Sequence, residues 1–341
     1  MATIHSTIIS GAGASSALLP LLAGKTSILL VTDKNVGALE ATQAIHRLLA
    51  AEGRVVEVID TVPAEPSHHD VAQIVSQLDA SQPQLVVGIG GGSVLDVAKL
   101  LSVLLHPEAP ALTALLAGEQ PQRRIGSLLI PATAGTGSEA TPNAILAIPE
   151  QQTKVGIISP VLLPDYVALL PELTTSMPAS IAASTGIDAL CHLLEMLWAS
   201  WYGGAAINHA GTHLVHALSY PLGGTWHLPH GVANAILLAP CMRVIRPHAV
   251  VKFAQVWDLI PDADRTLSEE EKSHALVAWL AALVKRLPLP DNLAALGVPQ
   301  ESIPALSAAA QNVKRLMNNA PCSVSREEIA AIYQTLFPGH A

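Results

Sequence analysis

Short apolar runs alternate with amphipathic stretches through the first half of the chain. Four runs rich in Ile, Leu and Val predict buried strands: SILLV at 27–31, RVVEVI at 54–59, QLVVGIG at 84–90 and SLLIPAT at 127–133. The stretches between them, such as ALEATQAIHRLLAAEG, repeat their apolar residues every three or four positions, which predicts helices. Strands that alternate with helices in this way indicate a parallel α/β sheet.

The pattern changes after about residue 160. Strand-like runs give way to long stretches rich in Ala and Leu, which are interrupted by the breaks PELTTSMP, YGG and PLGG. We therefore predict an α/β domain over residues 1–159 and an all-helical domain over residues 160–341. The length of the chain also agrees with two domains, because a typical domain has ~150 residues.

Composition narrows the possible classes of function. Half of the 341 residues are hydrophobic, but no apolar run reaches the ~18 residues of a membrane-spanning helix. The beginning of the chain lacks the pattern of a signal peptide, so we expect a cytoplasmic protein with no membrane partner. The net charge of −9, without a run of like charges, argues against nucleic acid as a partner. Three scattered cysteines are too few for a disulfide framework or a Cys-based zinc site.

A glycine-rich turn joins the third predicted strand to the next helix. In GIGGGSVLDVAK, Gly90, Gly91, Gly92 and Ser93 stand at the helix start, where free N–H groups and the helix dipole favour an anion such as a pyrophosphate. Asp96 follows Ser93 at the spacing of a capping box, so it is either a helix cap or a ligand contact. The turn lacks the G-x-G-x-x-G pattern, which disfavours a classical Rossmann unit.

Polar residues follow two other predicted strands. Asp33 follows SILLVT, and a carboxylate there accepts hydrogen bonds from a ribose 2′-hydroxyl and repels a 2′-phosphate, which favours NAD over NADP. An ordinary solvated turn residue fits the same position. The loop PATAGTGSEAT carries Thr133, Thr136 and Ser138, which either bind a polar ligand or satisfy the backbone of their own loop.

Histidines gather in the helical half of the chain. Asp188 and His192 are four residues apart in STGIDALCHLLEML, so both project from one helical face; such a pair is also typical of a surface pair or a satisfied core histidine. One carboxylate and three imidazoles are a set typical of a divalent transition metal. The candidates for that set are Asp188, His192, His216 and His230. Because His209, His213 and His216 share one helical face, spacing alone leaves open which of these are ligands.

Four motifs occur in an order and spacing that resemble the iron-containing (group III) alcohol dehydrogenase family. They are GGGSVLDVAK, PATAGTGSEAT, GIDALCHLLE and HALSYPLGGTWHLPHGVANAILLAP, and the resemblance covers about residues 28–335. It implies the dehydroquinate synthase-like architecture of that family. In that architecture an α/β dinucleotide-binding domain is followed by an all-α domain, and the site lies in the cleft between them. The resemblance also implies a homodimer.

The resemblance further implies roles for single residues. It places the metal ligands on Asp188, His192, His216 and His230, and thereby selects His216 over His209 and His213. It places coenzyme contacts on Asp33, Gly90, Gly91, Gly92, Ser93, Asp96, Thr133, Thr136, Ser138 and Lys154. Imidazole and carboxylate ligands accept both Fe²⁺ and Zn²⁺, so the ligand types do not separate these two metals.

One position departs from the family pattern. Many members carry a second histidine four residues after the position of His216, where it takes part in proton relay, and this chain carries Tyr220. The segment HLVHALSYPLGG resembles the corresponding segment of the hydroxyacid-oxoacid transhydrogenase branch of the family. Tyr220, His227 and His213 are therefore the candidates for passing on the hydroxyl proton, and His227 fits a pocket-lining or a surface residue equally well.

The activity that these features predict is reversible hydride transfer between a small alcohol and NAD, with the metal polarising the substrate oxygen. Alternatives are an oxidoreductase like the maleylacetate reductases, against which the intact ligand set argues, or one like the transhydrogenases. A non-redox synthase or lyase of the dehydroquinate synthase type needs a basic cluster for phosphate, but Arg243, Arg246 and Lys252 are scattered along the sequence. A binding protein without turnover is the alternative from another class.

Overall fold

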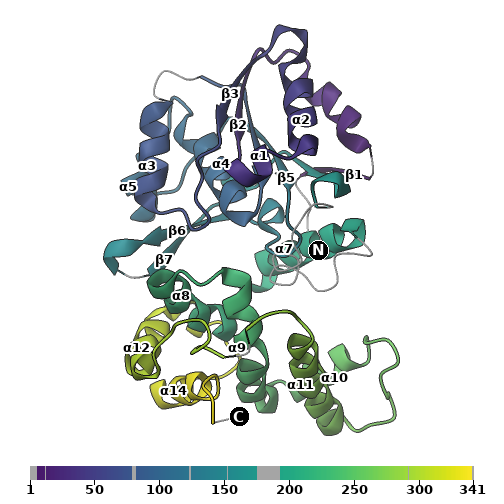
Figure 1. Ribbon diagram of the computed structural model, residues 1–341, viewed down its shortest axis with the longest axis vertical. Coiled ribbons are helices and arrows are strands. Elements are labelled where there is room, and N and C mark those ends of the chain that lie inside the picture. The colour runs from purple at the N-terminus through teal and green to yellow at the C-terminus, as the bar shows by residue number, and fades with distance from the viewer. Residues whose placement is uncertain are drawn as a thin grey trace. The chain divides into compact units, whose positions relative to one another are not determined.

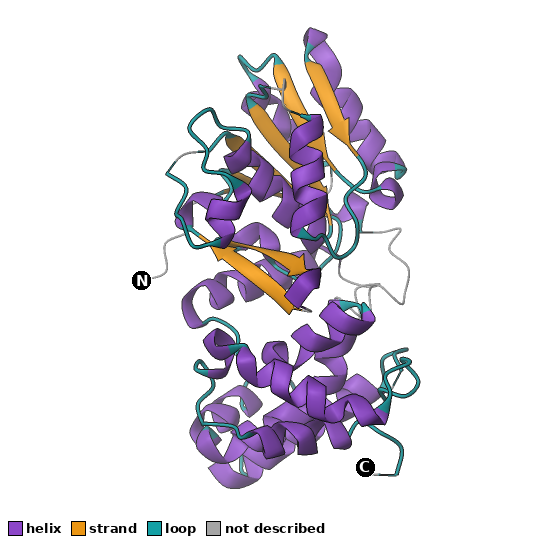
Figure 2. Cartoon of the chain, turned by 90° about the vertical axis from the view of Figure 1, so that its left-hand side faces the viewer, coloured by secondary structure: helices purple, strands orange, loops and turns teal. Residues whose placement is uncertain are grey.

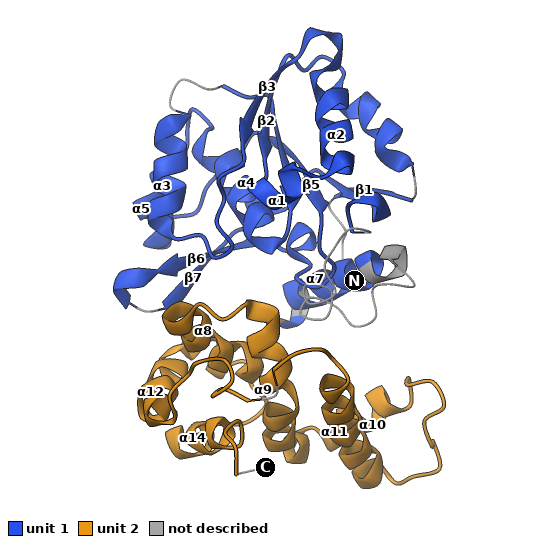
Figure 3. Cartoon of the chain, in the orientation of Figure 1, with its two compact units in different colours: residues 1–210 blue, residues 211–341 orange. Residues whose placement is uncertain are grey.

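The computed structural model describes residues 6–11, 13–78, 82–122, 124–151, 153–174, 193–290 and 292–339. The chain forms two compact units, unit 1 with residues 1–210 and unit 2 with residues 211–341 (Figure 3). Within the described ranges, we find no helix with the length and apolar character needed to cross a membrane.

Unit 1 is built on a sheet of six parallel strands (Figure 1). Their order across the sheet is β1-β8-β5-β4-β2-β3. The strands are β1 (Thr7–Ser10), β2 (Ser27–Val31), β3 (Val55–Ile59), β4 (Leu85–Gly90), β5 (Gly126–Pro131) and β8 (Tyr166–Leu169). Every pairing in this sheet is parallel, which confirms the predicted α/β fold of the N-terminal half.

Helices cover both faces of this sheet (Figure 2). They are the 3₁₀ helix Ala14–Leu22, α1 (Lys34–Gly37), α2 (Glu40–Ala50), α3 (His68–Gln77), α4 (Gly92–Leu104), α5 (Leu112–Leu116) and α7 (Leu193–Ala210). In β2, Leu29 and Val31 pack into one core with α3 and α4, whereas Ile28 and Leu30 pack into a second core with α2 and the 3₁₀ helix. Because both faces are buried, the central strands read as continuous apolar runs in the sequence.

The α/β unit extends further along the chain than the sequence pattern predicts. After the predicted boundary at residue 159, β8 still pairs in parallel with β1 and β5. A strand of four residues that follows directly on Pro164 and Asp165 is too short to stand out as an apolar run. Unit 1 also contains an antiparallel hairpin that the sequence analysis does not anticipate, formed by β6 (Asn143–Ile148) and β7 (Thr153–Ile158).

All regular secondary structure among the described residues of unit 2 is helical, as predicted for the C-terminal half. Its helices are α8 (Leu214–Trp226), α9 (His230–Ile245), α10 (Val250–Trp257), α11 (Glu269–Lys285), α12 (Ile303–Asn312), α13 (Lys314–Met317) and α14 (Arg326–Gln334). They surround one apolar core to which α8, α9, α12 and α14 all contribute. The buried Tyr333 of α14 donates a hydrogen bond of 2.6 Å to the carbonyl oxygen of Leu218, which ties α14 to α8.

Candidate active site

The glycine-rich turn connects the end of β4 to the first turn of α4, as its sequence predicts. Gly91 is the N-cap residue, and the first hydrogen bond of the helix runs from the N–H of Leu95 to the Gly91 carbonyl at 3.1 Å. The N–H groups of the first helical turn have no carbonyl within the helix to which they can donate. Together with the helix dipole, these N–H groups make the start of α4 a site suited to an anion.

The second loop of hydroxyl-bearing residues packs directly against this turn. A Cβ on Gly92 would lie 2.9 Å from the side chain of Thr136, and one on Gly91 would lie 3.5 Å from Thr133 Oγ1. A Cβ on Gly90 would lie 2.6 Å from Val94, so only glycine fits there. The structure thus brings together two loops that are about forty residues apart in the sequence.

Asp96 has a different role from the helix cap that its spacing allows. No side chain caps α4, and the carboxylate of Asp96 is buried beneath the loop that carries Ser138. It accepts hydrogen bonds of 2.5 Å from Ser138 Oγ and 2.9 Å from the backbone N–H of Ile145. Of the two alternatives for Asp96, the helix cap is therefore wrong, because Asp96 lies on the buried side of α4 and uses both oxygens to hold the loop and β6. The hydroxyl group of Ser138 is the donor in the first of these bonds, so it is used within the protein.

Lys99 completes this buried network, although the sequence analysis did not single it out. Its side chain is fully buried, and its Nζ lies 2.9 Å from Asp96 Oδ1. The same ammonium donates to the carbonyls of Ser138, at 2.9 Å, and Asn143. The signal in the sequence was a lysine in an otherwise apolar stretch of helix, three residues after an aspartate.

Glu139 lies beside this network and is also fully buried. Burial raises the pKa of its carboxyl group to about 7, against smaller opposing effects of its backbone hydrogen bond and the charge of Lys99. Its Oε1 atom has no hydrogen-bond partner among the described residues. The carboxyl group of Glu139, within the candidate coenzyme loop, is therefore close to its midpoint of ionisation at neutral pH.

The remaining coenzyme candidates all lie in unit 1. Asp33 follows β2 and caps α1, because its Oδ1 accepts hydrogen bonds of 2.9 Å from the N–H of Asn35 and 3.0 Å from that of Val36. Ser93 Oγ donates to the carbonyl of Ala64. Lys154 is largely buried on β7 and forms an ion pair with Glu65. Of these three side chains, only Asp33 has its charge at the carboxyl end of a central strand.

In unit 2, two of the predicted metal ligands lie close together, with their rings tilted by 55°. His216 is in the first turn of α8 and His230 is the first residue of α9, and their ring centroids are 5.2 Å apart. The amide nitrogen of Asn234 lies 3.0 Å from His230 Nε2 and 3.5 Å from His216 Nε2. Both Nε2 atoms therefore face the same small region. Asn234 was not predicted, although its place one turn after His230 was a signal.

The chemistry of this histidine pair fits a transition-metal ion. Burial lowers the pKa of His216 to about 4, with smaller effects of the charges of His213 and Arg315, so the ring is neutral at physiological pH. A neutral imidazole offers the lone pair that a metal requires. Asn234 Oδ1 is buried and has no hydrogen-bond partner within the described part of the chain. Asp188 and His192, the other two predicted ligands, lie outside the described residues.

The expectation that three histidines share one helical face is wrong. The helix α7 ends at Ala210, Gly211 adopts a left-handed φ of 68°, and α8 begins only at Leu214. His209 and His216 therefore belong to different helices. A Cβ on Gly211 would lie 2.8 Å from Asn319 Nδ2, so this break has both a conformational and a packing reason.

Tyr220 and His227, two of the three candidates for proton relay, differ in their surroundings. Tyr220 is buried one turn after His216, and its ring centroid lies 6.3 Å from that of His230. His227 is exposed and ends α8 with a left-handed φ of 54°, which few residues other than glycine adopt. Its N–H donates to the carbonyl of Gly223 at 3.1 Å. Tyr220 thus lies next to the histidine pair, whereas His227 lies at the solvent-exposed end of the same helix.

A parallel sheet with a turn suited to an anion, together with two imidazoles whose Nε2 atoms converge, is typical of nicotinamide-linked, metal-dependent oxidoreductases. The chain belongs to the iron-containing alcohol dehydrogenase family. Residues 5–171 match the family described as iron-containing alcohol dehydrogenase, and residues 194–337 match the C-terminal part of the same family. The resemblance of the four sequence motifs is thereby confirmed.

Relatives of known activity match nearly the whole chain. It is 32% identical to long-chain-alcohol dehydrogenase 1 of Geobacillus thermodenitrificans, covering 96% of this chain and 94% of that one. It is 27% identical to lactaldehyde reductase of Escherichia coli K12, with 92% of each chain covered. The solved structure of a 1,3-propanediol oxidoreductase superposes with a TM-score of 0.89 at 26% identity, covering 97% of this chain and 98% of that one.

Membership of this family confirms the predicted activity at the level of reaction class. The protein is an alcohol oxidoreductase, which interconverts alcohols and carbonyl compounds with a nicotinamide coenzyme. The family also implies a bound metal.

Proposed function

We propose that the protein transfers hydride reversibly between a small alcohol and NAD at a metal held by Asp188, His192, His216 and His230. The observation that carries the proposal is the convergence of His216 Nε2 and His230 Nε2 on the amide of Asn234. Two imidazoles that face one point beside an unsatisfied amide oxygen are arranged for a ligand that the protein itself does not supply. Either Fe²⁺ or Zn²⁺ suits this donor set.

The coenzyme side of the proposal rests on unit 1. The N–H groups at the start of α4 bind the pyrophosphate, and Gly90, Gly91 and Gly92 allow its close approach. Thr133 and Thr136 border the same turn, while the buried Asp96 and Ser138 hold that loop in position. Lys154 is a further proposed coenzyme contact, with its ammonium positioned by Glu65.

Asp33 gives the proposed preference for NAD. Both of its capping bonds go to Oδ1, so the carboxylate is fixed at the end of β2 with its charge intact. A fixed carboxylate accepts hydrogen bonds from the ribose hydroxyls of NAD and repels the 2′-phosphate of NADP.

In the proposed reaction, the alcohol loses one hydride and one proton. The C–H hydride passes to nicotinamide C4, the hydroxyl proton leaves through the protein, and the products are a carbonyl compound, NADH and H⁺. The bound metal supplies a Lewis acid that favours loss of the hydroxyl proton. Tyr220, buried beside His230, accepts that proton at its phenol oxygen while it releases its own hydroxyl proton, and His227, exposed at the end of α8, takes up the released proton and passes it to solvent.

The assay that tests this proposal combines elemental analysis with NADH formation. The substrates are long-chain alcohols, 1,3-propanediol and lactaldehyde, because relatives are named for activity on these compounds. We expect the wild-type protein to contain about one metal ion per chain and to turn over members of this panel. His216→Ala is expected to lose both the metal and the activity.

His213→Ala is the matched control for metal content. His213 immediately precedes α8 and its pKa is also lowered by burial, but it is not one of the proposed ligands. This variant is expected to keep the metal. Retention of the metal by His216→Ala, or its equal loss from both variants, would refute the ligand set. Turnover of none of the panel by a protein with metal and NAD bound would refute the reaction.

A further inference from the structure

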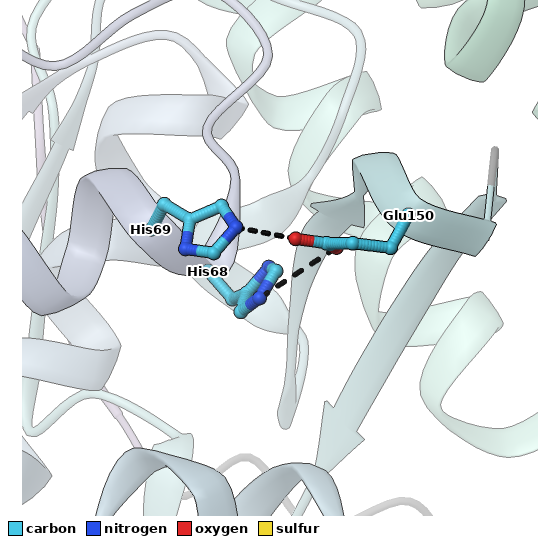
Figure 4. Close-up of side chains that lie close together, drawn as sticks. All are labelled: His68, His69 and Glu150. Atoms are coloured by element: carbon cyan, nitrogen blue, oxygen red, sulfur yellow. Dashed lines mark hydrogen bonds and ion pairs between the residues drawn. The ribbon is translucent and has the colours of Figure 1, made fainter.

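A second group of metal-ligating side chains lies in unit 1, among residues that the proposed reaction does not use. His68, His69 and Glu150 each offer one ligand atom, and these atoms all lie within 4.8 Å of one another (Figure 4). His69 Nε2 is 2.5 Å from Glu150 Oε1, and His68 Nε2 is 3.8 Å from Glu150 Oε2. None of the three belongs to a motif that carries the family resemblance.

The backbone fixes the two segments that carry these side chains. His68 and His69 open α3, and Glu150 lies in the 3₁₀ turn Pro149–Gln151, which follows β6. The two segments pair where Ser67 forms a parallel bridge with Ala147, and the N–H of Ala147 donates to the carbonyl of Pro66 at 2.9 Å. The three ligands are therefore brought together by main-chain pairing and not only by the approach of exposed side chains.

The ring of His68 is oriented as in many metal sites. Its Nδ1 lies 3.4 Å from the carbonyl oxygen of Ala147, to which an Nδ1–H donates. Metal-binding histidines commonly donate their other ring N–H to a backbone carbonyl, because this bond fixes the ring and the tautomer. In that tautomer, Nε2 carries the lone pair, and Nε2 is the atom that faces Glu150.

The observed spacings are close to those of a tetrahedral site. Bonds of about 2.1 Å to a central zinc ion place neighbouring ligand atoms about 3.4 Å apart. The distance from His69 to Glu150 must open by about 1 Å, and that from His68 to Glu150 must close by less. His69 and Glu150 are 65% and 55% exposed, so their side chains are free to make these shifts.

Two nearby carboxylates and one helix dipole determine how well this group can accept a divalent cation. The start of α3 carries the positive end of the helix dipole, which opposes a cation. The carboxylate of Glu150 and that of Asp70, which caps the same helix start together with Ser67, offset this effect. Two imidazoles and one carboxylate favour Zn²⁺, Ni²⁺ or Cu²⁺ over Mg²⁺ and Ca²⁺, which prefer all-oxygen ligands.

We propose that His68, His69 and Glu150 form a second metal site, separate from the histidine pair of unit 2. It binds Zn²⁺ or a similar transition-metal ion through three protein ligands, and water completes the shell. The bound ion links the β6–β7 hairpin to the first turn of α3. Lys154 of β7 forms an ion pair with Glu65, which lies just before α3, so this link also restrains the segment that carries Lys154.

The test is equilibrium dialysis of the holoenzyme against zinc chloride, followed by analysis of total metal per chain. We expect the wild-type protein to bind about one ion more than His69→Ala or Glu150→Gln. His274→Ala is the matched control, since His274 lies 3.4 Å from Glu270 on α11 and is 64% exposed, but among the described residues this pair is not part of a three-ligand group. It is expected to keep the full count.

Two further readouts separate this site from the proposed catalytic one. His216→Ala is expected to lose the resident metal and still take up the additional zinc, whereas His69→Ala shows the opposite behaviour. Zinc is also expected to raise the Tm of the wild-type protein but not that of His69→Ala, because an ion that binds only the folded chain stabilises it. Equal metal counts in the wild type and His69→Ala, or the same loss in His274→Ala, would overturn the proposal.

Discussion

In unit 1, both oxygens of Asp96 accept hydrogen bonds from the protein and the ammonium of Lys99 has several acceptors, so this buried polar network is complete by itself. In unit 2, the amide of Asn234 contacts both histidines of the pair, but its buried Oδ1 has no hydrogen-bond partner among the described residues. Buried polar groups are normally satisfied, so an unsatisfied group requires an explanation. The comparison teaches that the first network holds the fold, whereas the second set of groups is arranged around a ligand.

Removing the ammonium of Lys99 is the strongest test of the network in unit 1. Lys99→Met leaves the carboxylate of Asp96 buried without its counter-charge, and losing one partner of a buried ion pair costs about 3–5 kcal/mol. We expect the free energy of unfolding, measured in urea, to fall by that amount.

Arg47→Met provides the control for this substitution. Arg47 and Glu40 form an ion pair of 2.7 Å, but their side chains are 63% and 85% exposed, and such pairs contribute little. No measurable loss is expected. If Lys99→Met unfolded at the same urea concentration as Arg47→Met, the network would not be what holds this loop and α4 together.

Glu139 lies beside the network of unit 1 but is not satisfied by it, and its titration predicts a dependence of stability on pH. Its folded pKa of about 7 is raised above the ordinary value of 4.5, so the folded state binds the proton more tightly than the unfolded state. The resulting stability is present in full below about pH 4.5 and is lost as the pH rises to about 7. We expect the loss to be on the order of 3 kcal/mol.

Glu139→Gln isolates this effect, because the amide has nearly the shape of the acid and does not ionise. We expect the urea midpoints of the wild type and the variant to lie close together at pH 5. At pH 8 the variant should be the more stable of the two. Parallel pH profiles for the two proteins would show that Glu139 does not titrate in this range.

Asn234 tests the claim that the polar groups in unit 2 serve a ligand. Its amide lies beside the Nε2 atoms of His230 and His216, and its buried Oδ1, which has no partner among the described residues, is placed to accept a hydrogen bond from a water on the proposed metal. Outer partners of this kind typically contribute 10–100-fold to metal affinity. We expect Asn234→Ala to lower metal affinity within about that range, measured by competition with a chelator. Asn319→Ala, which removes a hydrogen bond of 3.1 Å to the Thr212 carbonyl, is the control and should leave affinity unchanged.

The two regions also differ in how far their residues could be predicted from the sequence. The glycine turn, the loop of Thr133 to Ser138 and the central strands follow from local patterns, and the structure places all of them as expected. The hydrogen bonds of Asp96 with Ser138 and Ile145 could not be predicted, because they join residues more than forty positions apart. The spacing of Ser93 and Asp96 allowed only a choice between a helix cap and a ligand contact.

Helical periodicity was a weaker guide in the second region. It cannot show that Gly211 ends one helix and that another begins three residues later, so it placed His209 on the same face as His216. The family resemblance selected His216 and His230, and the structure places these two side by side. The proposed role of His68 and His69 depends on tertiary contacts that neither residue type nor spacing indicated, and the place of Asn234 one turn after His230 was the single sequence signal for its role.

The smallest expected effect concerns Asp33, which combines a fold role and a ligand role in one side chain. Asp33→Ser keeps a good N-cap for α1, since serine caps about as well as aspartate, but removes the negative charge at the end of β2. We expect the ratio of kcat/KM for NAD to that for NADP to fall about tenfold, or roughly 1.4 kcal/mol, with little change in Tm. Glu40→Gln, which removes an exposed charge at the start of α2, is the control and should leave the ratio unchanged. A fall in Tm without any change in the ratio would mean that Asp33 serves only the fold.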